Sequence, residues 1–142
     1  MNREDIFEAL FDLVANAAEF KTKKRRLKLW TEVNGSQRPA LFVAQRGETY
    51  IRNSEAVPQK VVLKAEIYIY TDAGKDPNVI PATDLNKLVD AVDAALAPSP
   101  VTGRQTLGGL VSHCWIEGDV MTDPGDLDGD GMAIIPVRIL VP

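Results

Sequence analysis

The last third of the chain constrains the fold most. Two apolar runs, residues 111–121 and 133–141, flank a glycine-rich connector whose only charged residues are acidic. Runs of this length and composition are typical of β-strands, and Asp and Gly readily adopt the backbone conformations of a turn. We therefore expect a C-terminal β-hairpin whose final strand is built into a sheet.

The periodicity of apolar residues predicts the elements that come before this hairpin. Residues 61–70 alternate between apolar and mostly polar side chains, as in a strand with one buried face. Residues 3–20 and 83–97 place apolar side chains three and four positions apart, as in amphipathic helices, with Asn2 and Thr83 as expected N-caps. Short strands are expected at residues 27–33 and 41–44, and loops at residues 46–58 and 71–81.

The order of helix, strands, helix and strands predicts the α+β class. We expect an α/β sandwich in which a single mixed or antiparallel sheet carries two main helices on one face. With 142 residues, the chain suits a single domain over residues 1–142 that buries roughly two-thirds of its unfolded surface. Six side chains from both helices and the strand at 61–70 should be buried together: Leu10, Phe11, Ile67, Ile69, Leu88 and Val92.

Composition argues against membrane and secretory classes. Hydrophobic residues make up 45% of the chain and charged residues 25%, as in an ordinary soluble domain. No apolar run approaches the ~18 residues that a membrane span needs. The N-terminal segment carries acidic residues before its apolar ones, unlike a signal peptide. The single cysteine, Cys114, cannot form an internal disulfide, which fits a reducing cytoplasm.

The residues that commonly perform catalysis are sparse. His113 and Cys114 are the only histidine and cysteine, and adjacent residues of a strand point to opposite faces, so they cannot form a nucleophilic pair. Cys114 is therefore expected to be a small buried side chain. Residues 103–109 contain glycines but lack the lysine of a phosphate-binding loop. We expect neither an enzyme nor a bound cofactor; an enzyme would have to rely on carboxylates alone.

A calcium site is an alternative reading of the acidic connector. Asp126, Asp128 and Asp130, followed by Gly131, resemble the start of an EF-hand loop. The twelfth position of that loop requires a bidentate glutamate but holds Val137, and strands rather than helices are expected on either side. A turn within a hairpin connection is the favoured reading, and a small calcium-binding module remains the alternative.

The charged residues are gathered into two blocks of opposite sign. Six of the sixteen basic residues lie within residues 21–28, and residues 117–130 contain six acidic residues and no basic one. The net charge of −4 gives no general attraction to nucleic acid. Opposite patches on one small domain favour head-to-tail docking between copies. The candidate interface residues are Lys23, Lys24, Arg25, Arg26, Lys28, Glu117, Asp119, Asp126, Asp128 and Asp130.

Several segments together suggest a family. They are the N-terminal helix, the strand start Arg38-Pro39-Ala40-Leu41, the helix PATDLNKLVDAVDAAL, and the stretches RQTLGGLVSHCWIEGDV and GDLDGDGMAIIPVRILVP. With these features the chain resembles the tail terminator proteins of long-tailed bacteriophages. The resemblance covers nearly the whole chain, and the last third is its most specific part.

The resemblance implies a structural role. Tail terminators are small α/β proteins that form a ring of six subunits at the head-proximal end of the tail tube. The ring stops polymerisation of the tube protein and presents a surface to the head connector, without enzymatic activity or cofactor. DNA would meet such a protein only by passing through the ring lumen, and the protein would be assembled in the host cytoplasm into the virion tail. A neck or completion protein of the head-tail joint is the nearest alternative. Loops expected at 46–58, 71–81 and 122–131 are candidates for axial or lumen-facing contacts.

Overall fold

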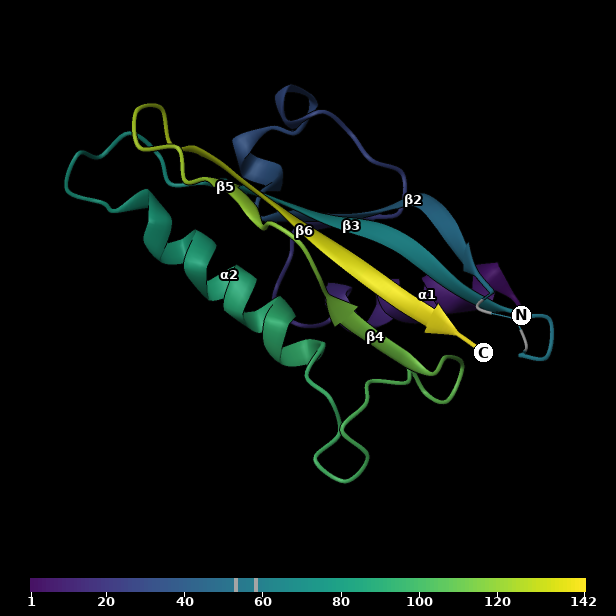
Figure 1. Ribbon diagram of the computed structural model, residues 1–142. Coiled ribbons are helices and arrows are strands. Elements are labelled where there is room, and N and C mark those ends of the chain that lie inside the picture. The colour runs from purple at the N-terminus through teal and green to yellow at the C-terminus, as the bar shows by residue number, and fades with distance from the viewer. Residues whose placement is uncertain (53, 58) are drawn as a thin grey trace.

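A computed structural model describes residues 1–142 except Asn53 and Pro58. Figure 1 shows an α+β fold with helices packed on a sheet, as the sequence predicted. The elements of the described residues, in chain order, are α1 (Arg3–Ala15), β1 (Thr22–Lys24), β2 (Ala40–Ile51), β3 (Lys60–Asp72), α2 (Pro81–Ala95), β4 (His113–Ile116), β5 (Met121–Asp123) and β6 (Asp130–Val141), with short 3-10 turns at Trp30–Glu32 and Gly35–Gln37.

The sheet is mixed. Its strand order is β1-β2-β3-β6-β4, and β5 also pairs with β6. β1 runs parallel to β2, whereas all other pairs are antiparallel. β4 and β5 therefore share the outer edge of β6, one after the other along its length. The expected C-terminal hairpin is present as β5 and β6.

The main core lies between the helices and one face of the sheet. Alternate side chains of β3 and β6 point into it and meet the apolar stripes of α1 and α2. Leu10, Val92, Ile67 and Ile69 are fully buried there, as predicted. The other two predicted core residues, Phe11 and Leu88, are only partly buried at its margin.

The opposite face of the sheet is covered at one end only. A small cluster of Val33, Ala40, Phe42 and Tyr70 is buried there, with Leu27 packed against it. Further along this face the apolar side chains are only half-buried, and they are Val62, Tyr68, Ile134, Pro136 and Leu140. One face of the sheet is thus closed by helices, and the other is partly open.

Both helix predictions need small corrections at their ends. Asn2 caps α1 as expected, accepting the N–H of Asp5 at 3.2 Å, but the helix ends at Ala15 rather than at residue 20. The Asn16 side chain donates to the Asp12 carbonyl at 2.8 Å and so competes with the next turn of backbone hydrogen bonds. α2 begins at Pro81, whose fixed φ suits the first turn, and Thr83 is not its cap.

Of two strand predictions in the first half of the chain, the one at residues 27–33 was wrong and the one at residues 41–44 was too short. Residues 27–33 are irregular apart from a 3-10 turn, whereas β1 lies just before them within the basic segment. β2 continues to Ile51 through residues expected to form a loop, with an irregularity between Gln45 and Gly47. Beyond this bulge every β2 side chain is exposed, so the apolar alternation that marks a half-buried strand is missing.

The run at residues 111–121 is broken into two short strands. β4 ends at Ile116, opposite Val137, and the next residue of β6 along this edge is Pro136, which has no N–H to donate. Gly118 follows with a φ of 108°, a conformation that side-chain-bearing residues avoid. Pairing with β6 resumes only at Met121, opposite Ile134.

Candidate assembly surface

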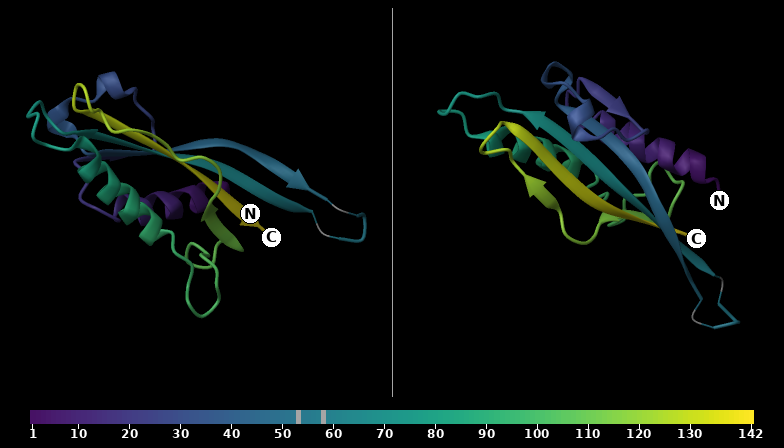
Figure 2. Two further views of the ribbon diagram at one scale, coloured as in Figure 1. Left: turned by 60° about the vertical axis from the view of Figure 1, so that its left-hand side comes forward. Right: turned by 90° about the horizontal axis from the view of Figure 1, so that it is seen from above.

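The two charged blocks lie at opposite edges of the sheet and at the same level. Pairing across the strands aligns Thr22 with Ala40, Tyr70, Met132 and Asp123 in one row. A parallel row runs from Lys24 through Phe42, Tyr68 and Ile134 to Met121. Figure 2 shows β1 and β5 on either side of the sheet. The basic and acidic segments therefore face away from each other within one molecule.

The basic block, residues 21–28, is mostly open to solvent. Lys23 and Lys24 on β1 are exposed, as is Arg26 after it. Arg25 is the exception, because its guanidinium pairs with Glu4 of α1 and donates to the Gln45 side chain at 3.1 Å. Lys28 is half-buried and contributes its backbone carbonyl to the Tyr70 hydroxyl at 2.6 Å.

The acidic block, residues 117–130, likewise has some carboxylates in ion pairs and others outside them. Asp119, Asp126 and Asp128 are exposed. Glu117 lies 3.8 Å from the Arg138 guanidinium and accepts from the Trp115 indole at 3.2 Å. Asp130 is paired with Arg38. Of the ion pairs among the described residues, none joins the basic block to the acidic block.

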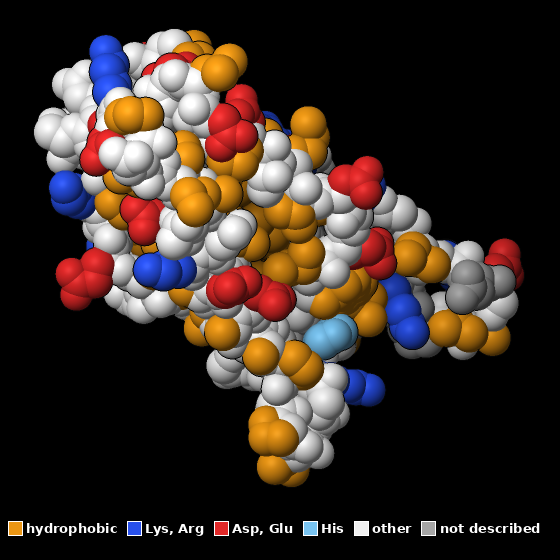
Figure 3. Space-filling model, turned by 90° about the vertical axis from the view of Figure 1, so that its left-hand side faces the viewer, with side chains coloured by type: hydrophobic (Ala, Val, Ile, Leu, Met, Phe, Trp, Pro, Cys, Tyr) orange, Lys and Arg blue, Asp and Glu red, His pale blue; other side chains and the backbone are white. Residues whose placement is uncertain are grey.

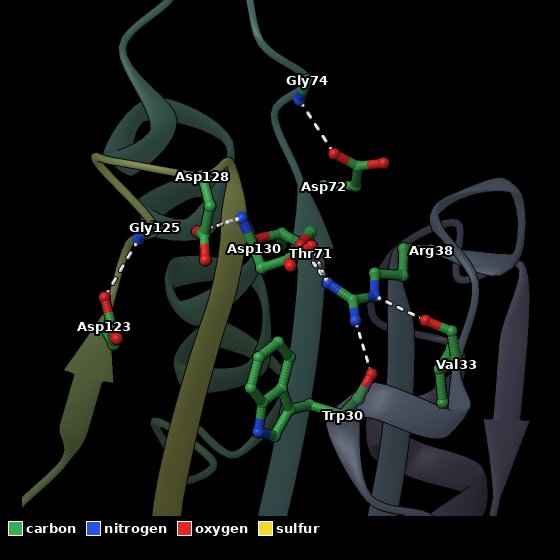
Figure 4. A network of polar contacts seen from close by, with 10 residues as sticks. All are labelled: Trp30, Val33, Arg38, Thr71, Asp72, Gly74, Asp123, Gly125, Asp128 and Asp130. Atoms are coloured by element: carbon green, nitrogen blue, oxygen red, sulfur yellow. Dashed lines mark hydrogen bonds and ion pairs between the residues drawn. The ribbon is translucent and has the colours of Figure 1, made fainter.

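A buried arginine fixes the shape of this end of the sheet, and sequence reasoning missed it. Figure 4 shows the Arg38 guanidinium among backbone carbonyls from two segments and the side-chain carboxylate of a third. It donates to the carbonyls of Val33 at 3.1 Å, Trp30 at 2.6 Å and Thr71 at 3.0 Å, and to the Asp130 carboxylate at 2.9 Å. Two of these bonds satisfy carbonyls of residues 27–33, the segment expected to be a strand, with a side-chain donor instead of a neighbouring strand.

The signal that could have revealed Arg38 was its place in the sequence. It stands immediately before the proline and the apolar run that opens β2. A charged side chain so close to the core needs partners, and a guanidinium has five N–H groups to donate. Its partners could not be read from the sequence, because Asp130 lies 92 positions away.

The aspartates of the connector bind the chain itself. Asp123 accepts the N–H of Gly125 at 3.1 Å, and Asp128 accepts the N–H of Asp130 at 2.9 Å. A surface pocket of about 240 Å³ lies between them and Trp30. Across the described residues, no group of three or more His, Cys, Asp or Glu side chains converges in a way that could hold a metal ion.

Two of the three loops proposed for axial contacts meet at one end of the molecule. The Ala73 N–H donates to the Gly129 carbonyl at 2.9 Å, which joins the β3–α2 connection to the acidic connector. A Cβ on Gly129 would lie 2.2 Å from the Gly74 carbonyl oxygen, so only glycine fits there. The hairpin of β2 and β3 projects at the opposite end, on the side of the molecule where both termini lie (Figure 2). The molecule therefore presents two different ends.

His113 and Cys114 point to opposite faces of β4, as predicted. Cys114 is fully buried, and burial raises the pKa of its thiol to about 12. His113 stacks on Trp115 with ring centroids 5.1 Å apart, and its Nδ1 accepts the N–H of Gln105 at 3.1 Å. The two side chains do not form a nucleophile and base.

An apolar hollow opens between α2 and β4. It has a volume of about 480 Å³, and its lining includes Asp93, Leu96, His113, Trp115 and Ile116. Figure 3 shows hydrophobic side chains exposed across the middle of this side of the molecule, with the histidine at their margin.

In the described part of the chain, neither helix has the length and apolar character needed to cross a bilayer.

Comparison with models of known protein families and with curated protein sequences found no match for this chain.

Proposed function

We propose that this protein is a structural subunit that caps the head-proximal end of a bacteriophage tail tube, as the resemblance to tail terminators implies. Copies would join head to tail into a ring and would catalyse no reaction. One ring face would match the end of the growing tube, and the other would meet the head connector while failing to template another ring of tube protein.

The observation that carries this proposal is that the two edges of the sheet differ in charge and the two ends of the molecule differ in structure. Its two edges bear opposite charge at the same level, which is the requirement for one patch to dock on a different patch of a neighbour. Its two ends also differ, because one has the projecting β2–β3 hairpin and the other has the joined loops. A ring of such subunits has two unlike faces, and unlike faces are what one-sided capping needs.

A capping assay tests the proposal. Tube protein is polymerised alone and with a stoichiometric excess of this protein, and tube lengths and ends are examined by electron microscopy. We expect tubes to stop growing and to carry an extra ring of density at one end. Continued elongation, with no density at the ends, would refute tube capping. Binding to the isolated head connector without binding to tubes would assign the protein to the neck instead.

A further inference from the structure

The edge of the sheet formed by β4 and β5 has its backbone groups covered at the β4 end and uncovered at the β5 end. At the β4 end, the Cys114 N–H donates to the Gln105 carbonyl at 2.8 Å, so the preceding loop covers that edge. For Met121–Asp123 of β5, the described residues provide backbone hydrogen bonds only from β6. All three residues are exposed, and Met121 retains 64% of its accessible surface. An uncovered strand edge can accept another strand.

β1 provides the other uncovered edge. It is the last strand on its side of the sheet, and its described backbone partners lie on the β2 side, where the Thr22 N–H reaches the Pro39 carbonyl at 3.5 Å. The side chains of Lys23 and Lys24 are exposed. Lysine on an edge strand discourages pairing in general, and an acidic strand is the partner whose charge offsets that effect.

The directions of the two edge strands allow them to pair. β1 is parallel to β2, β2 is antiparallel to β3, β3 to β6, and β6 to β5. β1 and β5 therefore run in opposite directions. When one copy is placed beside another with the sheets level, the β1 of the first meets the β5 of the second as an antiparallel strand.

Keeping the sheets level also fixes the register. Because Thr22 and Asp123 occupy one row of the sheet, and Lys24 and Met121 another, these residues would face each other across the junction. The same register carried past the strand ends brings Arg26 opposite Asp119 of the second copy. Lys24 lies diagonal to Asp123, within reach of a long side chain. Residues of opposite charge thus fall together along the junction.

We infer that β1 of one copy pairs antiparallel with β5 of a second copy of this chain, so that the sheet continues from subunit to subunit. This inference rests on the proposed function, because it describes the contact from which the ring is built. Pairing of β1 with β1 would bring lysines together, and pairing of β5 with β5 would bring aspartates together, so charge disfavours both symmetric alternatives. The contact is heterologous and can be repeated around a ring.

Disulfide trapping between two differently labelled chains tests the pairing directly. One variant carries Lys23→Cys and the other carries Thr122→Cys, since these positions face each other in the proposed register. Paired strands bring Cα atoms to distances that a disulfide bridges. The native Cys114 does not interfere, because its thiol is buried and its pKa is raised to about 12.

The variants are mixed at high concentration in a thiol redox buffer, and the mixed disulfide dimer is quantified on non-reducing gels. The matched control mixes Lys23→Cys with Thr102→Cys, which is exposed on the loop before β4. We expect the edge pair to give at least about tenfold more mixed dimer than the control, since held thiols react at a raised effective concentration. Equal yields in the two mixtures would overturn the inference. If tube capping persists alongside equal yields, the proposed function stands and only this contact is wrong.

Discussion

Arg38 and Asp130 form an ion pair of 2.9 Å although they are 92 positions apart in the sequence. The arginine stands just before β2 and the aspartate begins β6, so the pair links the two strands on either side of β3 at the end where the acidic connector lies. The Arg38 side chain is 4% exposed and the Asp130 side chain 38% exposed. Protein therefore keeps water away from the arginine, whereas water partly screens the aspartate.

Replacing Arg38 should destabilise the protein strongly. Arg38→Ala removes four hydrogen bonds and leaves the carbonyls of Trp30, Val33 and Thr71 without this donor. Each buried acceptor that loses its donor costs about 1–3 kcal/mol, so the free energy of unfolding should fall by about 2 kcal/mol or more. The measurement is urea denaturation, with the exposed Arg104→Ala as control, which should change stability by less than about 0.5 kcal/mol. Similar values for the two variants would show that the Arg38 network does not stabilise the fold.

The second helix should contribute more to stability through Leu85 than through Leu88. This side chain is 1% exposed within the main core, whereas Leu88 is only partly buried. Leu85→Ala should cost roughly 2–5 kcal/mol, because it leaves a cavity in a packed core. Leu88→Ala should cost less, since its site can rehydrate. Denaturant unfolding of both variants provides the comparison, and a larger loss for Leu88→Ala would mean that α2 is rotated relative to this structure.

How far the sequence predicts this fold depends on where the stabilising contacts come from. The strand at 61–70 and both helices were visible because one face of each is buried, and burial leaves a periodic pattern. β1 has no such pattern, since its exposed Lys23 and Lys24 take part in the sheet only through backbone pairing with β2. The second half of β2 is exposed on both faces, so it also lacks an apolar pattern. Neither could be found from side-chain periodicity.

The candidate interface shows the same limit. Charge clustering identified the two blocks, but the sequence could not tell which members have partners in the same chain. Arg25 pairs with Glu4, and Asp130 with Arg38. Those contacts depend on packing between distant segments. The alignment of Thr22 and Asp123 in one row also follows only from the strand order, which no local pattern encodes.

The Cys114 thiol should be unreactive in the folded protein. Burial raises its pKa from 9.0 to about 12, so the nucleophilic thiolate is scarce at neutral pH. A thiol reagent should label the native protein far more slowly than the urea-unfolded protein. Because the folded-state pKa is the higher one, the thiol's contribution to stability is complete below pH 9 and is lost as the pH rises from 9 towards 12.

The variant Cys114→Ala isolates this effect. Between pH 9 and 12 its free energy of unfolding should fall less steeply with pH than that of the unaltered protein, because the titrating thiol is gone. Tyr70, whose pKa burial also raises, is present in both proteins and cancels in the comparison. Equal slopes in this range, or rapid labelling of the native protein, would contradict the buried position of Cys114.

Calcium should not stabilise the protein. The carboxylates of Asp123, Asp128 and Asp130 bind backbone N–H groups or Arg38 rather than converging on a common point. Thermal melts in chelator and in excess calcium should therefore coincide. A rise of several degrees in the melting temperature with calcium corresponds to on the order of 1 kcal/mol of stabilisation by binding. That result would favour the calcium-binding alternative.

Charge reversal at the sheet edges should weaken contacts between copies, and reversal at both edges should restore them. The informative residues are exposed ones that lie together in the proposed register, Lys24 and Arg26 on one edge and Asp119 and Asp123 on the other. Arg25 and Asp130 are unsuitable, because their reversal would break the contacts with Glu4 and Arg38 inside one molecule.

The double variants are Lys24→Glu with Arg26→Glu, and Asp119→Lys with Asp123→Lys. Each exposed pair contributes only ~0–1 kcal/mol, so two attractions turned into repulsions should weaken association by roughly tenfold or more. The loss should be largest at low salt, where screening is weakest. Sedimentation velocity at low and high salt measures it, and Lys75→Glu with Lys87→Glu, on other exposed sites, is the control that matches the charge change of the first double variant. The quadruple variant places glutamates opposite lysines again, and we expect it to associate like the unaltered protein. If it associates no better than either double variant, the two edges do not meet, and the charges serve contacts with the tube or the connector instead.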